Sequence, residues 1–244
     1  MGSQVSKIIR LGSVAVLVGG IAASLSLASP AMAGKKKPAP PPPPPPPKQI
    51  YVAWKPTTPE WATPTLAYPP IGADGLRVSV NRNISPSQMV WNLRSGLNVA
   101  ALNCRDAEHA EVLTNYKLLL KSHAKGLRAI NAKIDGEWKA KYGTGFIKAR
   151  EKYMTEVYNH FSIPPVKPAF CNAALAVSRE LPTVKAADLN AFAIRSLPSL
   201  EIVFDDFFKR FDQYHTDMAA WEARWGKDAV PGSLVVETPR NVGG

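Results

Sequence analysis

Residues 106–142 read DAEHAEVLTNYKLLLKSHAKGLRAINAKIDGEWKAKY, and this stretch decides the fold. Its apolar and ring-bearing positions recur at alternating steps of four and three: His109, Leu113, Tyr116, Leu120, His123, Leu127, Ile130 and Ile134. That heptad spacing predicts one long helix packed against others in an antiparallel bundle. Gly126 and Gly136 each weaken a helix by about 1 kcal/mol relative to alanine, so either position can accommodate a kink or a break.

Helices are predicted on both sides of this segment. Ser85-Pro86-Ser87-Gln88 is a capping box with proline at the first helical position, and it starts a helix that runs to Cys104. Residues 75–81 alternate in polarity and predict either a short strand or an extended lead-in. Further helices are expected at 146–161, 169–181, 186–195 and 196–225, the last carrying a broad aromatic stripe. The sequence therefore predicts an all-α bundle of five to six helices over residues 74–229.

The two cysteines, Cys104 and Cys171, are the only ones in the chain. In an oxidising compartment an isolated pair is most simply one disulfide, here closing a loop of 68 residues. The chain-entropy model gives such a loop about 4 kcal/mol of stabilisation. Two free thiols or a metal pair are the alternatives, and neither cysteine has a second ligand at metal-binding spacing. We expect no metal and no cofactor.

The first 33 residues have the pattern of a secretory signal peptide. Lys7 and Arg10 precede an uncharged stretch, and Ala31-Met32-Ala33 supplies a cleavage site before Gly34. The alternative is an uncleaved segment, since 24 uncharged residues are long enough to span a bilayer. With cleavage the protein is periplasmic or secreted; without it, the protein is a membrane-anchored spacer.

Residues 34–73 form a basic, proline-rich arm. Lys35, Lys36 and Lys37 precede an unbroken proline run at 40–47, which predicts a stiff polyproline spacer. Four aromatic residues then alternate with prolines: Tyr51, Trp54, Trp61 and Tyr68. We interpret them as a strap whose rings fill grooves of the helical body; a strip that binds sugar or a partner is the alternative. Residues 230–244 are expected to form a flexible tail.

The chain is strongly basic, with a net charge of +11 that becomes +9 once residues 1–33 are removed. Residues 117–152 hold ten basic residues and three acidic ones. Within this span Lys117, Lys121, Lys125 and Arg128 recur at helical spacing and predict a charged stripe beside the apolar positions. The stripe is matched either by the seven acids of residues 201–228 or by an external anionic surface. An exported protein seldom meets nucleic acid, so we expect none as a partner.

Catalytic motifs are absent from the sequence, which lacks zinc-protease, haem-attachment and serine-hydrolase signatures. His109 and His123 are interpreted as residues at the edge of the core. Glu137 beside Trp138 is a weak candidate acid in an apolar pocket, and the adjacent Asp205 and Asp206 point in different directions on a helix. An enzyme is unsupported by these patterns rather than excluded.

Two stretches carry a resemblance to other proteins. YPPIGADG at residues 68–75 and WNLRSGLNVAALNC at residues 91–104 resemble a group of uncharacterised exported proteins of proteobacteria, over about residues 65–125. The resemblance implies an exported helical fold and implies no activity and no site residues.

Taken together, these patterns predict a non-enzymatic binding or scaffolding protein of the cell envelope. The basic arm and the basic stripe would face an anionic surface, a membrane surface included, or a protein partner. A wall-acting enzyme with an unrecognised site and a membrane-anchored spacer are the alternatives. The sequence leaves the oligomeric state open.

Overall fold

A computed structural model of the chain describes residues 40–43 and 46–237. The chain divides into two units, 1–46 and 47–244, and all regular elements described belong to the second. The predicted signal peptide and the lysines at 35–37 lie outside the described residues. The helices are α1 (Pro86–Asn103), α2 (Ala110–Ser122), α3 (Ala124–Tyr142), α4 (Phe146–Phe161), α5 (Lys167–Glu180) and α6 (Leu189–Trp225), and the strands are β1 (Lys48–Tyr51) and β2 (Leu234–Glu237). Short 3-10 turns occur at Pro59–Trp61, Ala107–His109, Gly143–Gly145, Pro164–Val166, Leu181–Thr183 and Ala186–Asp188.

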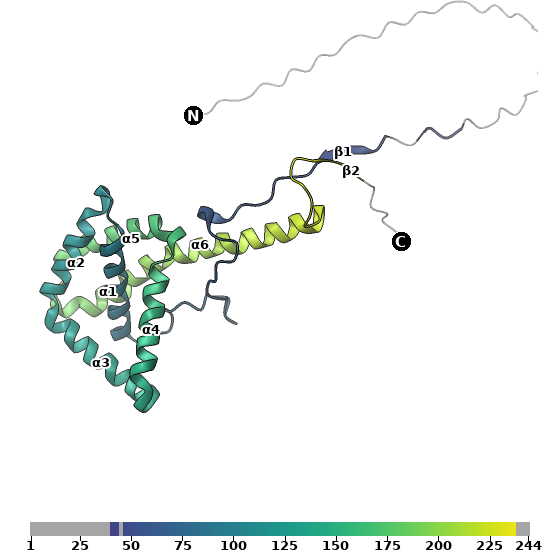
Figure 1. Cartoon of the computed structure of the whole chain (residues 1–244). Coiled ribbons are helices and arrows are strands. Elements are labelled where there is room, and N and C mark those ends of the chain that lie inside the picture. Colours follow the sequence, from purple (N-terminus) through teal and green to yellow (C-terminus); the bar gives the residue numbers. More distant parts are fainter. Residues whose placement is uncertain (1–39, 44–45, 238–244) are drawn as a thin grey trace, which may run out of the picture. The chain divides into compact units, whose positions relative to one another are not determined.

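The predicted helical character is confirmed, with one small two-stranded sheet beside the helices (Figure 1). Helix α1 is the central element and contacts each of the other five helices. It is preceded by the predicted cap: the Ser85 hydroxyl accepts a hydrogen bond from the Gln88 amide at 3.1 Å. In the part of the chain described here, no helix is both long and apolar enough to cross a bilayer.

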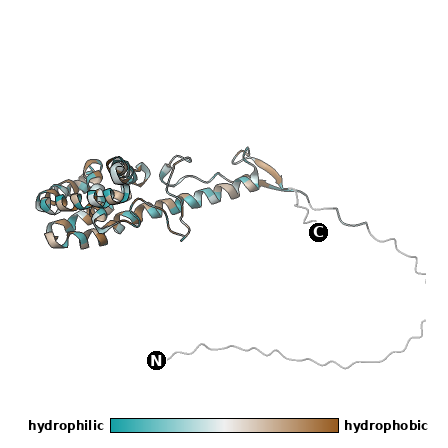
Figure 2. Cartoon of the chain, turned by 90° about the horizontal axis from the view of Figure 1, so that it is seen from below, coloured by the Kyte–Doolittle hydropathy of each residue, from teal (hydrophilic) through white to brown (hydrophobic). Residues whose placement is uncertain are grey.

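The core lies mainly between α1 and α6. Phe204, Phe207 and Phe208 of α6 are at most 1 % exposed, and this confirms the predicted aromatic stripe. Figure 2 shows hydrophobic and hydrophilic residues alternating along α6. Gly96 lets α1 approach closely, because a Cβ added there would lie 3.1 Å from both Leu200 and Phe161.

The predicted disulfide is present between Cys104 at the end of α1 and Cys171 in α5. Both cysteines are buried in the core. Because α2, α3 and α4 lie between these cysteines in sequence, the disulfide ties both ends of that segment to α1 and α5. The chain-entropy argument for its stabilising effect therefore applies to these three helices.

Two predicted helix boundaries were wrong. The expected single helix over 106–142 is two helices that meet at His123, and neither Gly126 nor Gly136 breaks it. The His123 side chain is only 4 % exposed. Its burial favours a break at His123 more strongly than the small helix penalty of glycine favours a break at Gly126 or Gly136. Conversely, the expected helices at 186–195 and 196–225 are one helix that passes through Pro198. The buried Leu197 and Leu200 hold both of its halves on the same core.

The segment before α1 packs along α6 as a strap. The Tyr68 ring stacks on Phe208 with centroids 5.6 Å apart, and its hydroxyl donates to Asp212 at 2.8 Å. The buried Arg77 also pairs with Asp212 and donates to the Pro69 carbonyl. Residues 75–81 form no strand and have only an isolated bridge between Ile71 and Arg77.

The predicted docking of aromatic rings holds for Tyr68 alone among the four. Tyr51, Trp54 and Trp61 are 71 %, 80 % and 89 % exposed, whereas the small side chains of Val52 and Ala62 in the same part of the strap are buried. Trp221 donates to the Ala53 carbonyl at 2.8 Å, and β1 pairs antiparallel with β2. Residues 234–237 of the expected flexible tail are therefore a paired strand.

Candidate functional site

The basic surface predicted from the sequence lies on α2, α3 and α4, which we call the basic helices. Eight of their cationic side chains are exposed and have no carboxylate within 4.0 Å among the residues described: Lys117, Lys121, Lys125, Arg128, Lys133, Lys139, Lys141 and Lys148. The remaining two are paired, Arg150 with Asp135 at 2.9 Å and Lys152 with Glu156 at 3.9 Å. The basic helices thus carry a surplus of uncompensated positive charge.

One alternative from the sequence was that the acids of residues 201–228 pair with the basic stripe. The ion pairs of α6 are different. Glu201 accepts a hydrogen bond from His160 at 2.9 Å, Asp212 pairs with Arg77, and Asp206 lies 3.5 Å from Lys209 of the same helix. Within the described parts of the chain, none of these contacts reaches α2 or α3. Glu201 and Asp212 instead hold the segment before α1 against α6.

The break at His123 divides the predicted stripe between two helices. Lys117 and Lys121 lie on α2, whereas Lys125 and Arg128 lie on α3. The four cations therefore do not form a line on one continuous helix. They border a bend in the chain, where Leu120, Ala124 and Arg128 line a cavity.

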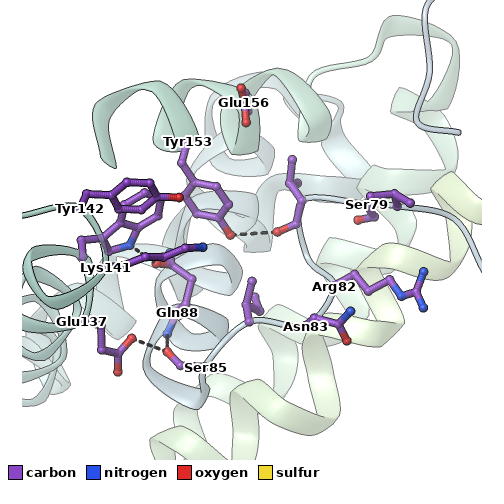
Figure 3. A pocket seen from close by; sticks show the side chains of 14 residues that line it. Ser79, Arg82, Asn83, Ser85, Gln88, Glu137, Lys141, Tyr142, Tyr153 and Glu156 are labelled. Atoms are coloured by element: carbon purple, nitrogen blue, oxygen red, sulfur yellow. Dashed lines mark hydrogen bonds between the residues drawn. The ribbon is translucent and has the colours of Figure 1, made fainter. Parts of the chain in front are cut away.

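Glu137 and Trp138 line an open cavity of about 490 Å³ between α3, α4 and the segment before α1 (Figure 3). Figure 3 shows Arg82 and Asn83 on the side opposite Lys141 and Tyr142. The cavity is lined by Val78, Ser79, Val80, Arg82, Asn83, Ile84, Ser85, Gln88, Glu137, Trp138, Lys141, Tyr142, Tyr153 and Glu156. The Ser85 hydroxyl donates to Glu137 at 2.6 Å, so this carboxylate is held beside the cap of α1.

The aromatic rings of this cavity pack on one another. Trp138 stacks on Tyr142 with centroids 5.1 Å apart and lies 5.2 Å from the Tyr153 ring. The Lys141 ammonium lies 5.2 Å from the Tyr142 ring centroid. These contacts hold the three rings together in one wall of the cavity, where Tyr142 stays 43 % exposed.

Tyr153 connects this cavity to a buried polar network. Its hydroxyl donates to the Val80 carbonyl at 2.8 Å and accepts from Asn92 at 2.7 Å. Burial raises the pKa of Tyr153 to about 12, so the hydroxyl stays protonated at neutral pH. Asn92 in turn donates to Asn81 at 2.8 Å and accepts from Gln88 at 2.8 Å. Each member is therefore held by the next, which makes the network rigid.

The network ends at Glu201 of α6. Its carboxylate accepts hydrogen bonds from Ser79, from Asn81 at 2.6 Å and from His160 at 2.9 Å. Burial acts to raise the pKa of Glu201, but the hydrogen bonds from His160, Ser79 and Asn81 outweigh it and lower the pKa. Ser79 donates to the carboxylate and not to His160, so the three groups are not arranged as a nucleophile activated by a histidine. They fasten residues 79–81 to α4 and α6.

The other histidine candidates are buried, and Asp205 lies near Glu201 on α6. His109 is buried and its Nε2 atom lies 2.8 Å from the Asn172 amide oxygen, next to the disulfide. His123 is buried at the α2–α3 break. Burial and the nearby Glu201 raise the pKa of Asp205. Among the residues described, no group of three or more potential ligands could hold a metal ion.

Sequence reasoning gave no role to Arg94 of α1. The structure places this half-buried residue beside Arg128 in the lining of the cavity at the α2–α3 bend. The available signal was its position: a basic residue between Leu93 and Ser95, on a helix whose other residues there are buried.

Comparisons with known proteins supply no family for this chain. A scan against protein-family models, a search of curated proteins and a search of solved structures each gave no match.

Proposed function

We propose that this chain is an exported, non-enzymatic binding or scaffolding protein of the cell envelope. Its basic helices, together with Lys35–Lys37 of the arm, face an anionic surface. The observation that carries this proposal is the set of eight exposed cations on α2–α4 without a carboxylate within 4.0 Å in the described chain. Like charges this dense repel one another, and an anionic surface relieves that repulsion while releasing its own counterions.

The proposal includes export of the chain to an oxidising compartment. The Cys104–Cys171 disulfide supports it, because such bonds persist in oxidising compartments. In this proposal residues 1–33 are removed as a signal peptide, and the mature chain begins near Gly34. The helices then act as an antiparallel bundle that displays α2–α4, and the lysines at 35–37 add to its positive charge.

Glu137 gives a second candidate function, an envelope enzyme that uses this carboxyl as an acid–base group. The observation in its favour is that Glu137 lines an open cavity that also contains Glu156. Its role as acceptor for the Ser85 hydroxyl argues for a structural task instead. Loss of a wall-cleaving activity in Glu137→Gln, with unfolding unchanged, would favour the enzyme.

Co-sedimentation tests the proposed function. The purified protein is mixed with isolated sacculi and with vesicles of phosphatidylglycerol, each at low and high salt. We expect binding to at least one of them at low salt, and its loss at high salt, because exposed charges are screened beyond a Debye length of about 10 Å at 0.1 M. Absence of binding to both would contradict the proposal.

Matched variants connect the binding to the basic helices. The triple variant Lys117→Gln, Lys121→Gln, Lys125→Gln should lose most of the binding. The control removes the same charge from exposed lysines outside α2–α4, with Lys167→Gln, Lys185→Gln and Lys227→Gln. Equal loss in both variants would mean that net charge, and not the basic helices, is responsible.

A further inference from the structure

A second cavity lies at the bend between α2 and α3, where both helices pass α1. Its volume is about 400 Å³. The lining residues are Trp91, Arg94, Leu120, Ala124, Leu127, Arg128, Ile130 and Asn131. Leu120 and Ala124 lie on either side of the break at His123, so the bend that divides the predicted stripe also forms one wall of this cavity.

Arg94 is the residue in this cavity that requires an explanation. It is half-buried on α1, and the described chain gives it no hydrogen bond and no carboxylate within 4.0 Å. No guanidinium nitrogen of Arg94 is among the buried unpaired atoms of the described chain, so these N–H groups stay in contact with water and are free to bind a ligand in the cavity. Burial raises the pKa of the neighbouring Tyr116, and the positive charge of Arg94 acts to lower it.

Two further donors line the same cavity. Arg128 enters from α3 and is likewise without an acid partner in the described residues. Asn131 accepts a hydrogen bond from Arg150 on its amide oxygen at 2.5 Å, which leaves its NH₂ group as a donor. Two guanidinium groups and an amide, with no carboxylate among the lining residues, form a set of donors suited to an anion.

The other lining residues are mainly apolar, and they favour an anion that carries a hydrocarbon group. Trp91, Leu120, Leu127 and Ile130 supply these walls. Arginine matches phosphate oxygens with paired N–H donors, whereas the apolar walls suit a hydrocarbon group. We propose that this cavity binds a phosphate group carried on an apolar chain, the chemistry of an anionic phospholipid headgroup. The inference rests on the proposed function, since it names the kind of anion that the basic helices meet.

Titration calorimetry with water-soluble probes tests the site. The probes are dihexanoyl phosphatidate below its micelle concentration, inorganic phosphate and hexanoate. We expect one molecule of phosphatidate to bind per chain, and the other two probes to bind at least about tenfold more weakly, because each uses only part of the cavity. Inorganic phosphate binding as tightly as phosphatidate would overturn the apolar part of the proposal, and no phosphatidate binding would overturn it entirely.

Three variants locate the binding. Arg94→Gln and Arg128→Gln should each weaken phosphatidate binding by about tenfold or more. Lys185→Gln removes an exposed cation that lies outside both the cavity and the basic helices, and it should change the affinity less than about twofold. Arg128 is exposed and its replacement leaves the core intact, so its variant decides the question even if Arg94→Gln is unstable. Unchanged affinity in Arg128→Gln would contradict the site.

Failure of this inference and failure of the proposed function can be told apart. The Lys117, Lys121 and Lys125 triple variant keeps every residue that lines the cavity, whereas Arg94→Gln keeps all exposed cations of α2 and α3. Surface binding that is lost only in the triple variant, with no phosphatidate binding in any protein, overturns the cavity alone. Phosphatidate binding that depends on Arg94, with surface binding intact in the triple variant, overturns the basic surface alone.

Discussion

Helix α6 and helix α3 differ in how their side chains are used. α6 buries four phenylalanines between residues 204 and 211 and directs several of its acids to Arg77, His160 and Lys209. α3 buries Ile134 alone, and five of its cations have no acid partner in the described chain. The contacts of these α6 residues thus stabilise the fold, whereas the cations on α3 make no ion pair that would do so. This contrast is the reason for assigning the binding surface to the basic helices.

The largest effect expected from this contrast is on the α6 side. Phe204 is fully buried and packs on Phe161, Phe170 and His160. Phe204→Ala should lower the free energy of unfolding by about 3–5 kcal/mol, measured by urea denaturation, because it leaves a cavity in a closely packed core. Ile147→Ala on α4 is the control: its side chain is 57 % exposed, so a change within about 0.5 kcal/mol is expected. An equal loss of unfolding free energy in both variants would contradict the claim that the α6 core, and not the surface of the basic helices, stabilises the fold.

The disulfide should give the next largest effect. Replacing Cys104 and Cys171 by serine should cost about 2–5 kcal/mol, because the loop between them is then unconstrained in the unfolded chain. Hydrogen exchange should increase most in α2–α4, the segment that the bond encloses, and least in α6. A uniform increase over all helices would contradict the idea that the bond chiefly holds the basic helices to the core.

The buried network should give a smaller, pH-dependent effect. The folded-state pKa of Glu201 lies below its ordinary value of 4.5, so its carboxylate stabilises the fold above that pH and less as the pH falls through the folded pKa. Glu201→Gln should therefore cost about 2 kcal/mol at pH 7, and the difference from the unmodified chain should shrink below pH 4.5. Urea denaturation across that range measures it. A difference that is the same at every pH would show that loss of shape, not of charge, is responsible.

Local signals predicted the parts of the fold that local interactions determine. The cap at Ser85 and the pairing of the two cysteines are both as expected. Helix boundaries that depend on packing were not predictable. The glycines of α3 cost too little to break a helix, and Pro198 was not a boundary because the core on both sides holds α6 continuous.

The candidate site could be predicted only in part. A count of charges located the basic span, and the structure adds that its cations lack internal partners in the described residues. The cavity at the α2–α3 bend was not predictable, because it depends on the break at His123 and on Arg94 from a helix distant in sequence. The pattern of charges and the helical spacing of apolar residues do not predict which helices contact one another at a bend.

The smallest effect on stability should come from the basic helices, and there the account is tested most directly. Unfolding and vesicle binding are measured on the same triple variant, Lys117→Gln, Lys121→Gln, Lys125→Gln. We predict a free energy of unfolding within about 0.5 kcal/mol of the unmodified chain, or slightly higher since like charges are removed, together with the loss of salt-sensitive binding. Marked destabilisation with binding retained would contradict the account.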